Sequence, residues 1–185
     1  MDKNLKDERA QARVNVRIRR LALGNPGDSH GVGEGVEEMR IDYGPGYRVY
    51  FTRRGMEVVI FLREEIRLHR NGTSQARRLS RVDWRSNMGT KTREWDTVEF
   101  LDSEEKMALY LEAALEEGDA GLVAAALGDI TRAKGMTEIA RESGLGRESL
   151  YKALSVDGNP TFATILKVIA ALGLKLQATP RHGAA

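Results

Sequence analysis

The stretch GMTEIARESGLGRESLYKAL, residues 135–154, decides the fold expected for the second half of this chain. In its first helix the small Ala140 permits a close helix crossing, and Gly144, four residues later, tolerates the positive φ of a tight turn. The apolar Leu145 directly after that glycine is expected to fill the space between two helices. This spacing predicts a helix-turn-helix over residues 136–154, and a helical hairpin inside a bundle is the alternative.

The second helix of this motif, residues 147–154, is expected to have a buried and an exposed face. Leu150 and Leu154 lie on the inward side at helical spacing. Because a recognition helix enters the major groove with its N-terminal part, the outward side chains are the expected DNA contacts: Arg147, Glu148, Ser149, Tyr151 and Lys152. Backbone N–H groups at the two helix starts, near Thr137 and Arg147, offer further contacts to phosphate.

These outward residues differ in the DNA groups that they suit. Arg147 is the candidate for specificity, because its guanidinium can form a forked pair of hydrogen bonds with O6 and N7 of guanine. Ser149 suits a base or a phosphate, and Glu148 can accept a hydrogen bond from N4 of cytosine. Tyr151 and Lys152 are expected to hold phosphates, which position a protein on DNA without specifying the sequence.

The composition is typical of a globular protein and excludes several kinds of site. The 185 residues suffice for one medium or two small domains, with 41% hydrophobic and 30% charged residues. The lack of cysteine excludes disulfides, thiolate ligands and cysteine nucleophiles, and three scattered histidines predict no metal site. No cofactor is expected. The apolar stretches are short and the first residues lack a secretory core, so a cytoplasmic protein without membrane contact is expected.

Charge is divided unequally between the two halves. Residues 1–91 carry 19 basic and 12 acidic side chains, a net charge of +7, whereas residues 92–185 carry 10 and 15, a net charge of −5. Complementary fields favour docking, so the basic half is expected to bind the acidic helix predicted over 103–118. Chance composition is the alternative.

The first half has the pattern of a helix followed by a small sheet. Gly-Asn-Pro-Gly at 24–27 ends the helix expected over 5–23. Three short segments rich in β-branched and aromatic residues, at 36–43, 47–53 and 56–62, predict a three-stranded antiparallel meander. The helix is expected to face its core with an apolar stripe at helical spacing: Ala10, Val14, Ile18 and Leu21.

After the expected strands, the pattern changes twice. Residues 63–91 show no sustained period and have a net charge of +5, and we interpret them as a basic linker. Helical spacing then returns, with Asp102 or Ser103 as a cap and Gly118 as the end of the next helix. The fold class predicted is therefore α+β, with an N-terminal helix and three-stranded sheet followed by an all-α domain.

The last predicted helix, residues 160–172, closes the helical domain. Asn159 suits its cap and Pro160 its first position. One apolar side is expected to belong to the core: Phe162, Ile165, Leu166, Ile169 and Leu172. Residues 174–178 are expected either to form a short strand that pairs two chains or to form none.

The second half resembles the HigA-like class of addiction-module antidotes. The resemblance covers about residues 92–176 and rests on EFLDSEEKMALYLEAALEEGD, LVAAALGDITRAKGMTEIARESGLGRESLYKALS and GNPTFATILKVIAALGL. It implies an antitoxin-type transcriptional regulator that binds its own operator DNA as a homodimer. The protein partner implied is a cognate RelE/HigB-like toxin or the chain's own N-terminal half.

The first half is similar to the RelE/HigB-like addiction-module killer protein, through RIRRLALGNPGD, GVGEGVEEMRIDYGPGYRVYFTRRG and MEVVIFL. That family implies a compact α+β ribonuclease that acts on the ribosome. Its members begin with a further strand and end with a Gly-Gly-Asp-Lys-Ser-like stretch and a closing helix, which this chain lacks. We therefore interpret 1–62 as a truncated toxin region, 63–91 as a linker with a shifted reading frame, and 92–185 as an antidote domain.

The toxin family holds phosphate and moves protons with basic and phenolic side chains on its sheet and near its C-terminus. By this resemblance Arg48 matches the sheet arginine, and Arg40 and Tyr50 are further candidates. The C-terminal groups have no counterpart, and loss of cooperating groups lowers a rate severely. The chain is therefore predicted not to be an enzyme. A ribosome-dependent mRNA endonuclease held silent by its fused antidote is the alternative.

Overall fold

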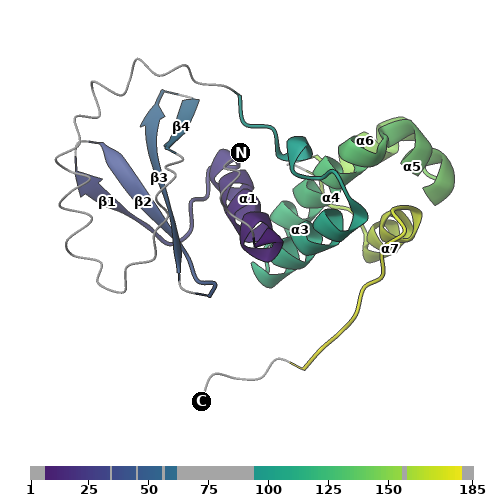
Figure 1. Ribbon diagram of the computed structural model, residues 1–185. Helices are drawn as coiled ribbons and strands as arrows, with labels where there is room; N and C mark the ends of the chain where they lie inside the picture. The colour runs from purple at the N-terminus through teal and green to yellow at the C-terminus, as the bar shows by residue number, and fades with distance from the viewer. Residues whose placement is uncertain are drawn as a thin grey trace. The chain divides into compact units, whose positions relative to one another are not determined.

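The computed structural model describes residues 7–33, 35–44, 46–55, 57–61, 94–155 and 158–180 (Figure 1). The protein is α+β, as the sequence predicts, with a helix and an antiparallel sheet followed by helices. It divides into two compact units, 1–116 and 117–185. No helix among the described residues is long and apolar enough to cross a membrane. The linker predicted over 63–91, with its shifted reading frame, lies outside the described residues.

Helix α1 (Glu8–Ala22) begins where Asp7 caps it. The Asp7 carboxylate accepts hydrogen bonds from the backbone N–H groups of Arg9 and Ala10, which satisfies two donors that have no partner inside the helix. The predicted apolar stripe is confirmed, because its four members are between 0% and 6% exposed: Ala10, Val14, Ile18 and Leu21.

Over the residues that the structure describes, the sheet has four antiparallel strands in the order β1-β2-β3-β4: β1 (Ser29–Gly33), β2 (Val36–Ile41), β3 (Tyr47–Arg54) and β4 (Glu57–Phe61). The expected number of three strands was wrong, because β1 is additional. Its sequence, SHGVG, has two glycines and a single apolar residue, so it carries no strand pattern of its own. Backbone pairing with β2 defines it, from Ser29 opposite Met39 to Gly33 opposite Val36.

One face of the sheet and one side of α1 form the core of the first unit. Met39, Val49 and Phe51 are 0% to 2% exposed and alternate along β2 and β3, as expected of strands with a single buried face. The stripe of α1 packs against them. Tyr43, Ile60 and Trp95 complete this cluster as partly buried residues. The other face of β2 and β3 therefore carries a different set of side chains.

The other elements that the structure describes in the first unit are a short 3-10 helix, η2 (Thr97–Glu99), and helix α3 (Glu104–Glu116). Ser103, one of the two predicted caps, accepts a hydrogen bond from the Lys106 N–H. Asp102, the other, forms an ion pair with the Lys106 side chain at 2.7 Å. Gly118 follows α3 at φ +70°, a conformation that favours glycine.

In the second unit the described residues form four helices: α4 (Ala120–Lys134), α5 (Met136–Ser143), α6 (Arg147–Ala153) and α7 (Phe162–Ala171). Helix α5 lies at its centre and packs against α4, α6 and α7. Lys134, at the end of α4, donates a hydrogen bond to the Leu172 carbonyl after α7 (3.0 Å). This bond ties together the ends of the two flanking helices.

Helix α7 differs from its prediction in its start and in one apolar side. It begins at Phe162 and is capped by Thr161, whose hydroxyl accepts from the Thr164 N–H, rather than by Asn159. A hydroxyl two residues after Asn159 supplies the same acceptor. Phe162 and Leu166 are 67% and 44% exposed, so the prediction that both belong to the core was wrong within this chain. Residues 174–178 form no strand.

Candidate functional site

Helices α5 and α6 meet across a three-residue turn. Ile139 and Ala140 of α5 are 0% and 7% exposed, as expected for the buried side of that helix. Gly144 ends α5 in the left-handed conformation (φ +67°), which a residue with a side chain rarely adopts. The Leu145 N–H donates to the Ala140 carbonyl (3.1 Å), and Leu145 itself is half-buried. The turn thereby sets the direction in which α6 leaves.

Two leucines anchor α6 and leave its other side exposed. Leu150 is 0% and Leu154 5% exposed, as the helical spacing predicts. The five outward candidates are all exposed: Arg147, Glu148, Ser149, Tyr151 and Lys152. The Arg147 guanidinium lies 5.7 Å from the centre of the Tyr151 ring, a cation–π arrangement one helical turn apart. A basic and an aromatic side chain thus share one outward surface.

Close packing against α4 fixes the far end of α6. A Cβ atom added to Gly128 of α4 would lie 2.7 Å from the Leu154 carbonyl oxygen, which real Cβ atoms essentially never do. Gly128 therefore allows the backbone of α6 to approach α4 directly. Helix α6 is held by Leu150 from its middle and by this approach at its end.

The starts of α5 and α6 also keep their first N–H groups without a side-chain cap. Gly135 precedes α5 and Gly146 precedes α6, and neither provides a capping oxygen. Thr137 is exposed in the first turn of α5. The structure places Thr137 and Arg147 at the two helix starts, where backbone N–H groups attract anions.

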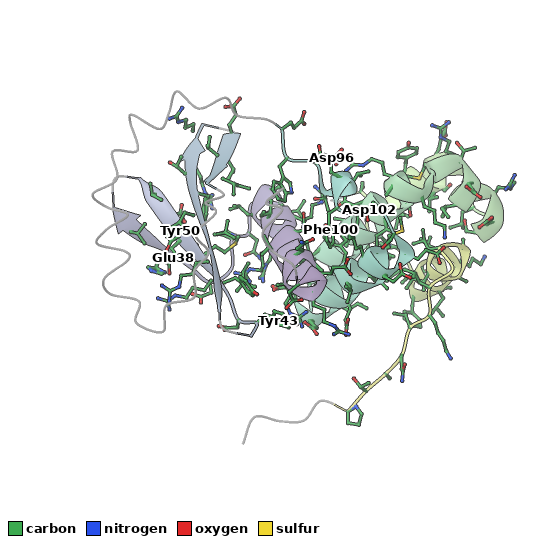
Figure 2. The ribbon with its side chains drawn as sticks, in the orientation of Figure 1. Glu38, Tyr43, Tyr50, Asp96, Phe100 and Asp102 are labelled. Atoms are coloured by element: carbon green, nitrogen blue, oxygen red, sulfur yellow. The ribbon has the colours of Figure 1, made fainter. Side chains whose placement is uncertain are left out.

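A second polar cluster lies on the sheet, on the face away from its core. Arg40 and Arg48 are cross-strand neighbours on β2 and β3, and each has a side-chain nitrogen 3.5 Å from Oε1 of Glu38. The Tyr50 hydroxyl donates to Oε2 of Glu38 at 2.9 Å, and Figure 2 shows the two side chains next to each other. All three toxin-like candidates therefore meet at one carboxylate.

Sequence reasoning missed the centre of this cluster. Glu38 is 1% exposed, although a strand with one wet face predicts an exposed carboxylate there. His30 on β1 joins it, with Nε2 at 3.8 Å from Oε1. The shared parity of residues 38 and 40 was the available signal, because it places both side chains on one face of β2. The pairing of His30 with Glu38 depended on the unexpected β1 strand.

The environment of Tyr50 disfavours its ionised form. Burial and the hydrogen bond to Glu38 raise the pKa of the Tyr50 phenol well above its ordinary value of 10.0, against a smaller opposing effect of Arg48. Within the described residues, no group of histidine, aspartate and glutamate side chains is suited to hold a metal ion. Arg40 and Arg48 can bind an anion only to the extent that the negative charge of Glu38 does not already offset their positive charge.

We expect the alkaline stability of the chain to depend on Tyr50. Because the pKa of Tyr50 is raised in the folded state, its contribution is complete below pH 10 and is lost as the pH rises through the raised pKa. The difference in unfolding free energy between the wild type and Tyr50→Phe should therefore narrow above about pH 10. Urea unfolding at several pH values measures this difference. A gap of constant size across that range would contradict the assignment.

The comparison with known protein families concerns the second half. Residues 91–180 match the family described as "Probable addiction module antidote protein". An uncharacterised protein of Haemophilus influenzae is 51% identical over 90 residues, which cover 49% of this chain and 93% of the relative. A second uncharacterised Haemophilus influenzae protein is 50% identical over 58 residues, or 31% of this chain and 59% of that relative. No solved structure matches the chain. Through residues 91–180, the chain belongs to the family of probable addiction module antidote proteins.

Proposed function

We propose that this chain is a cytoplasmic antitoxin-type transcriptional regulator that binds operator DNA through a helix-turn-helix formed by α5 and α6. The main support for this proposal is the surface of α6. Arg147, Tyr151 and Lys152 are exposed on this helix, and Leu150 on its other side is buried. The match to the antidote family supports the antitoxin part of this proposal, because an antidote implies a toxin partner. Neither a metal nor a cofactor is part of the proposal.

In this proposal some of the outward residues of α6 contact base edges and the others contact phosphates. Arg147 at the start of α6 reads guanine, with a discrimination of about 1 to 3 kcal/mol against a wrong base. Ser149 and Glu148 contact base edges or phosphate beside it. Tyr151 and Lys152 hold phosphates, as do the uncapped N–H groups at the start of α5 near Thr137. The cation–π contact with Tyr151 limits the rotamers of Arg147 before DNA arrives.

From the charge of the second half we infer that more than one copy binds the DNA. Residues 92–185 have a net charge of −5, and affinity for DNA depends on the number of phosphates neutralised. Phe162 and Leu166 supply an exposed apolar side on α7, one helical turn apart. We propose that two copies pair through this side of α7, and that the homodimer presents two copies of α6 to the two halves of an operator.

Phe162→Glu combined with Leu166→Glu is expected to produce a monomer, because two charges would have to be buried in the pairing surface. Operator affinity should fall by about tenfold or more, since only one half-site would be held. Sedimentation and a gel shift measure both effects. Leu115→Glu is the matched control, because Leu115 is an exposed leucine (43%) on α3 rather than α7. Equal effects of the control, or a dimeric double variant, would contradict the role of α7.

The proposal assigns no catalytic activity to the sheet. The single negative charge of Glu38 offsets one of the two positive charges of Arg40 and Arg48, and its carboxylate accepts a hydrogen bond from the Tyr50 hydroxyl. A phosphate would have to compete with a buried carboxylate for the same arginines. We interpret this region as a toxin remnant without ribonuclease activity. Ribosome-dependent mRNA cleavage that disappears in Arg48→Ala would establish the alternative, an endonuclease held silent by its fused antidote.

The experiment for the main proposal is a gel shift at low salt with DNA from the region upstream of the chain's own gene. The wild type should shift this DNA, and Arg147→Ala and Lys152→Ala should each weaken the shift. Lys175→Ala is the matched control, because Lys175 is an exposed lysine outside α5 and α6. The absence of any shift would refute operator binding. A shift that neither variant weakens would refute the placement of the recognition helix.

A further inference from the structure

We propose that the antidote segment, the part of the chain that matches the antidote family, binds its protein partner through α3. Helix α1 of the same chain occupies this binding surface. The N-terminal part is then a partner bound in cis. This inference rests on the proposed antidote function, and it adds the surface and the kind of partner. The partner chemistry is an arginine-bearing helix with small and β-branched residues between its arginines.

The boundary of the family match and the boundary between the compact units do not coincide. The antidote match begins at residue 91, whereas the first compact unit extends to residue 116. Residues 94–116, including the whole of α3, therefore belong to the antidote family by sequence but pack with the N-terminal region. This packing is the arrangement expected if the antidote-family segment is bound to the N-terminal region as to a protein partner.

Helix α1 has two buried sides, and the sheet accounts for only one of them. Ala12 and Val16 are 0% and 1% exposed, yet neither belongs to the cluster that α1 shares with the sheet. Among the described elements, α1 packs most extensively against α3, and Figure 1 shows the two helices beside each other. The side of α1 marked by Ala12 and Val16, which lie one turn apart, is therefore buried by α3.

Two ion pairs fix the register of α1 on α3. Arg9 lies 3.5 Å from Glu112, and Arg13 forms a closer pair with Glu116. A step of four residues along α1 matches a step of four along α3, so the two helices run parallel. The Arg13 guanidinium also lies 4.3 Å from the centre of the Tyr43 ring, so this one side chain contacts both α3 and the turn between β2 and β3.

The charges of the two helices are complementary beyond these pairs. Helix α1 contains five arginines and one glutamate, a net charge of +4, and α3 contains four glutamates and one lysine, a net charge of −3. Complementary potentials steer association and fix register. This is the helix on which the charge division along the sequence predicts docking.

Trp95 is a second, independent contact of the antidote segment with the N-terminal region. It lies within the family match and packs against the cluster formed by α1 and the sheet. Its indole N–H is buried. The antidote segment therefore reaches the N-terminal region at two places, once through an aromatic side chain and once through α3.

The test cuts the covalent connection of the folded chain. A specific protease site placed between Arg77 and Arg78 is cleaved after purification of the whole protein, and the association of the two pieces is measured at low salt. They should remain bound, because the α1–α3 contact does not depend on the linker. Glu116→Arg should weaken association by about tenfold, and Arg13→Glu in the same protein should restore it.

The matched control is Glu105→Arg, the same charge reversal at an exposed position of α3 without an ion pair to α1 among those described. It should leave association unchanged. Pieces that separate at low salt while each keeps its helical circular dichroism would overturn the inference. Equal weakening by Glu105→Arg and Glu116→Arg, or no restoration in the double variant, would also overturn it.

Exchange between copies tests whether the site is closed in cis. A labelled 1–77 piece should transfer between cleaved proteins but not onto the uncleaved chain, where the tethered α1 competes at high effective concentration. Equal transfer onto the uncleaved chain would show that α1 does not occupy the site. None of these measurements uses DNA, so loss of operator binding would refute the proposed regulator while leaving this interface intact.

Discussion

Leu150→Ala is expected to lower the free energy of unfolding of the second unit by about 2 to 5 kcal/mol. Leu150 is 0% exposed and is the residue from which α6 is anchored. Truncation to alanine removes its packing and leaves a cavity that α6, with seven residues, can only partly close. Because α6 is the proposed DNA reader, operator binding should fall together with stability. Urea unfolding of the whole chain measures the loss.

Tyr151→Ala is the matched control for this substitution, at the next position on the same helix. Tyr151 is 50% exposed, so the change should alter the free energy of unfolding by less than about 0.5 kcal/mol. It should nevertheless weaken operator binding, because its ring supports Arg147. Equal stability losses at positions 150 and 151 would show that α6 is not packed on its Leu150 side.

Glu38→Ala is expected to destabilise the first unit by about 2 to 4 kcal/mol. The carboxylate is 1% exposed, and its removal leaves Arg40 and Arg48 without their counter-charge and the Tyr50 hydroxyl without its acceptor. Because both arginines are partly exposed, water can solvate them after the carboxylate is removed. The loss in free energy of unfolding is therefore smaller than for a fully buried ion pair. Thermal or urea unfolding of the full chain measures the change.

Glu37→Ala is the control, at the preceding position of β2. Glu37 pairs with Arg53 at 3.6 Å, but its side chain is 33% exposed and lies on the opposite side of the strand. An exposed ion pair contributes about 0 to 1 kcal/mol, so little should change. A Glu38→Ala chain as stable as Glu37→Ala would mean that the cluster does not hold the sheet together.

The elements that the sequence predicted correctly are those whose local pattern and packing agree. The stripe of α1 is buried because helical spacing places its four residues on one side. Gly144 adopts the positive φ expected of it, and Leu150 lies inward on α6. At these positions the local sequence pattern alone was enough to predict which side chains are buried and where the turn lies.

The features that could not be predicted depend on residues far apart in the sequence. Strand β1 exists because it pairs with β2, and its own residues carry no strand signal. Glu38 is buried because side chains from three strands surround it. Some apolar residues of α7 are not buried within this chain. Helical spacing alone does not distinguish residues of the core from residues of a surface that pairs with another copy.

The most direct test of DNA binding by α6 is operator affinity as a function of salt and base sequence for the wild type, Arg147→Ala and Lys152→Ala. Lys152→Ala is expected to weaken binding to all sequences and to lower the salt slope by about one. Arg147→Ala is expected to lose discrimination at one base pair, worth about 1 to 3 kcal/mol. Unchanged salt slope and unchanged base preference in both variants would contradict the claim that α6 reads DNA.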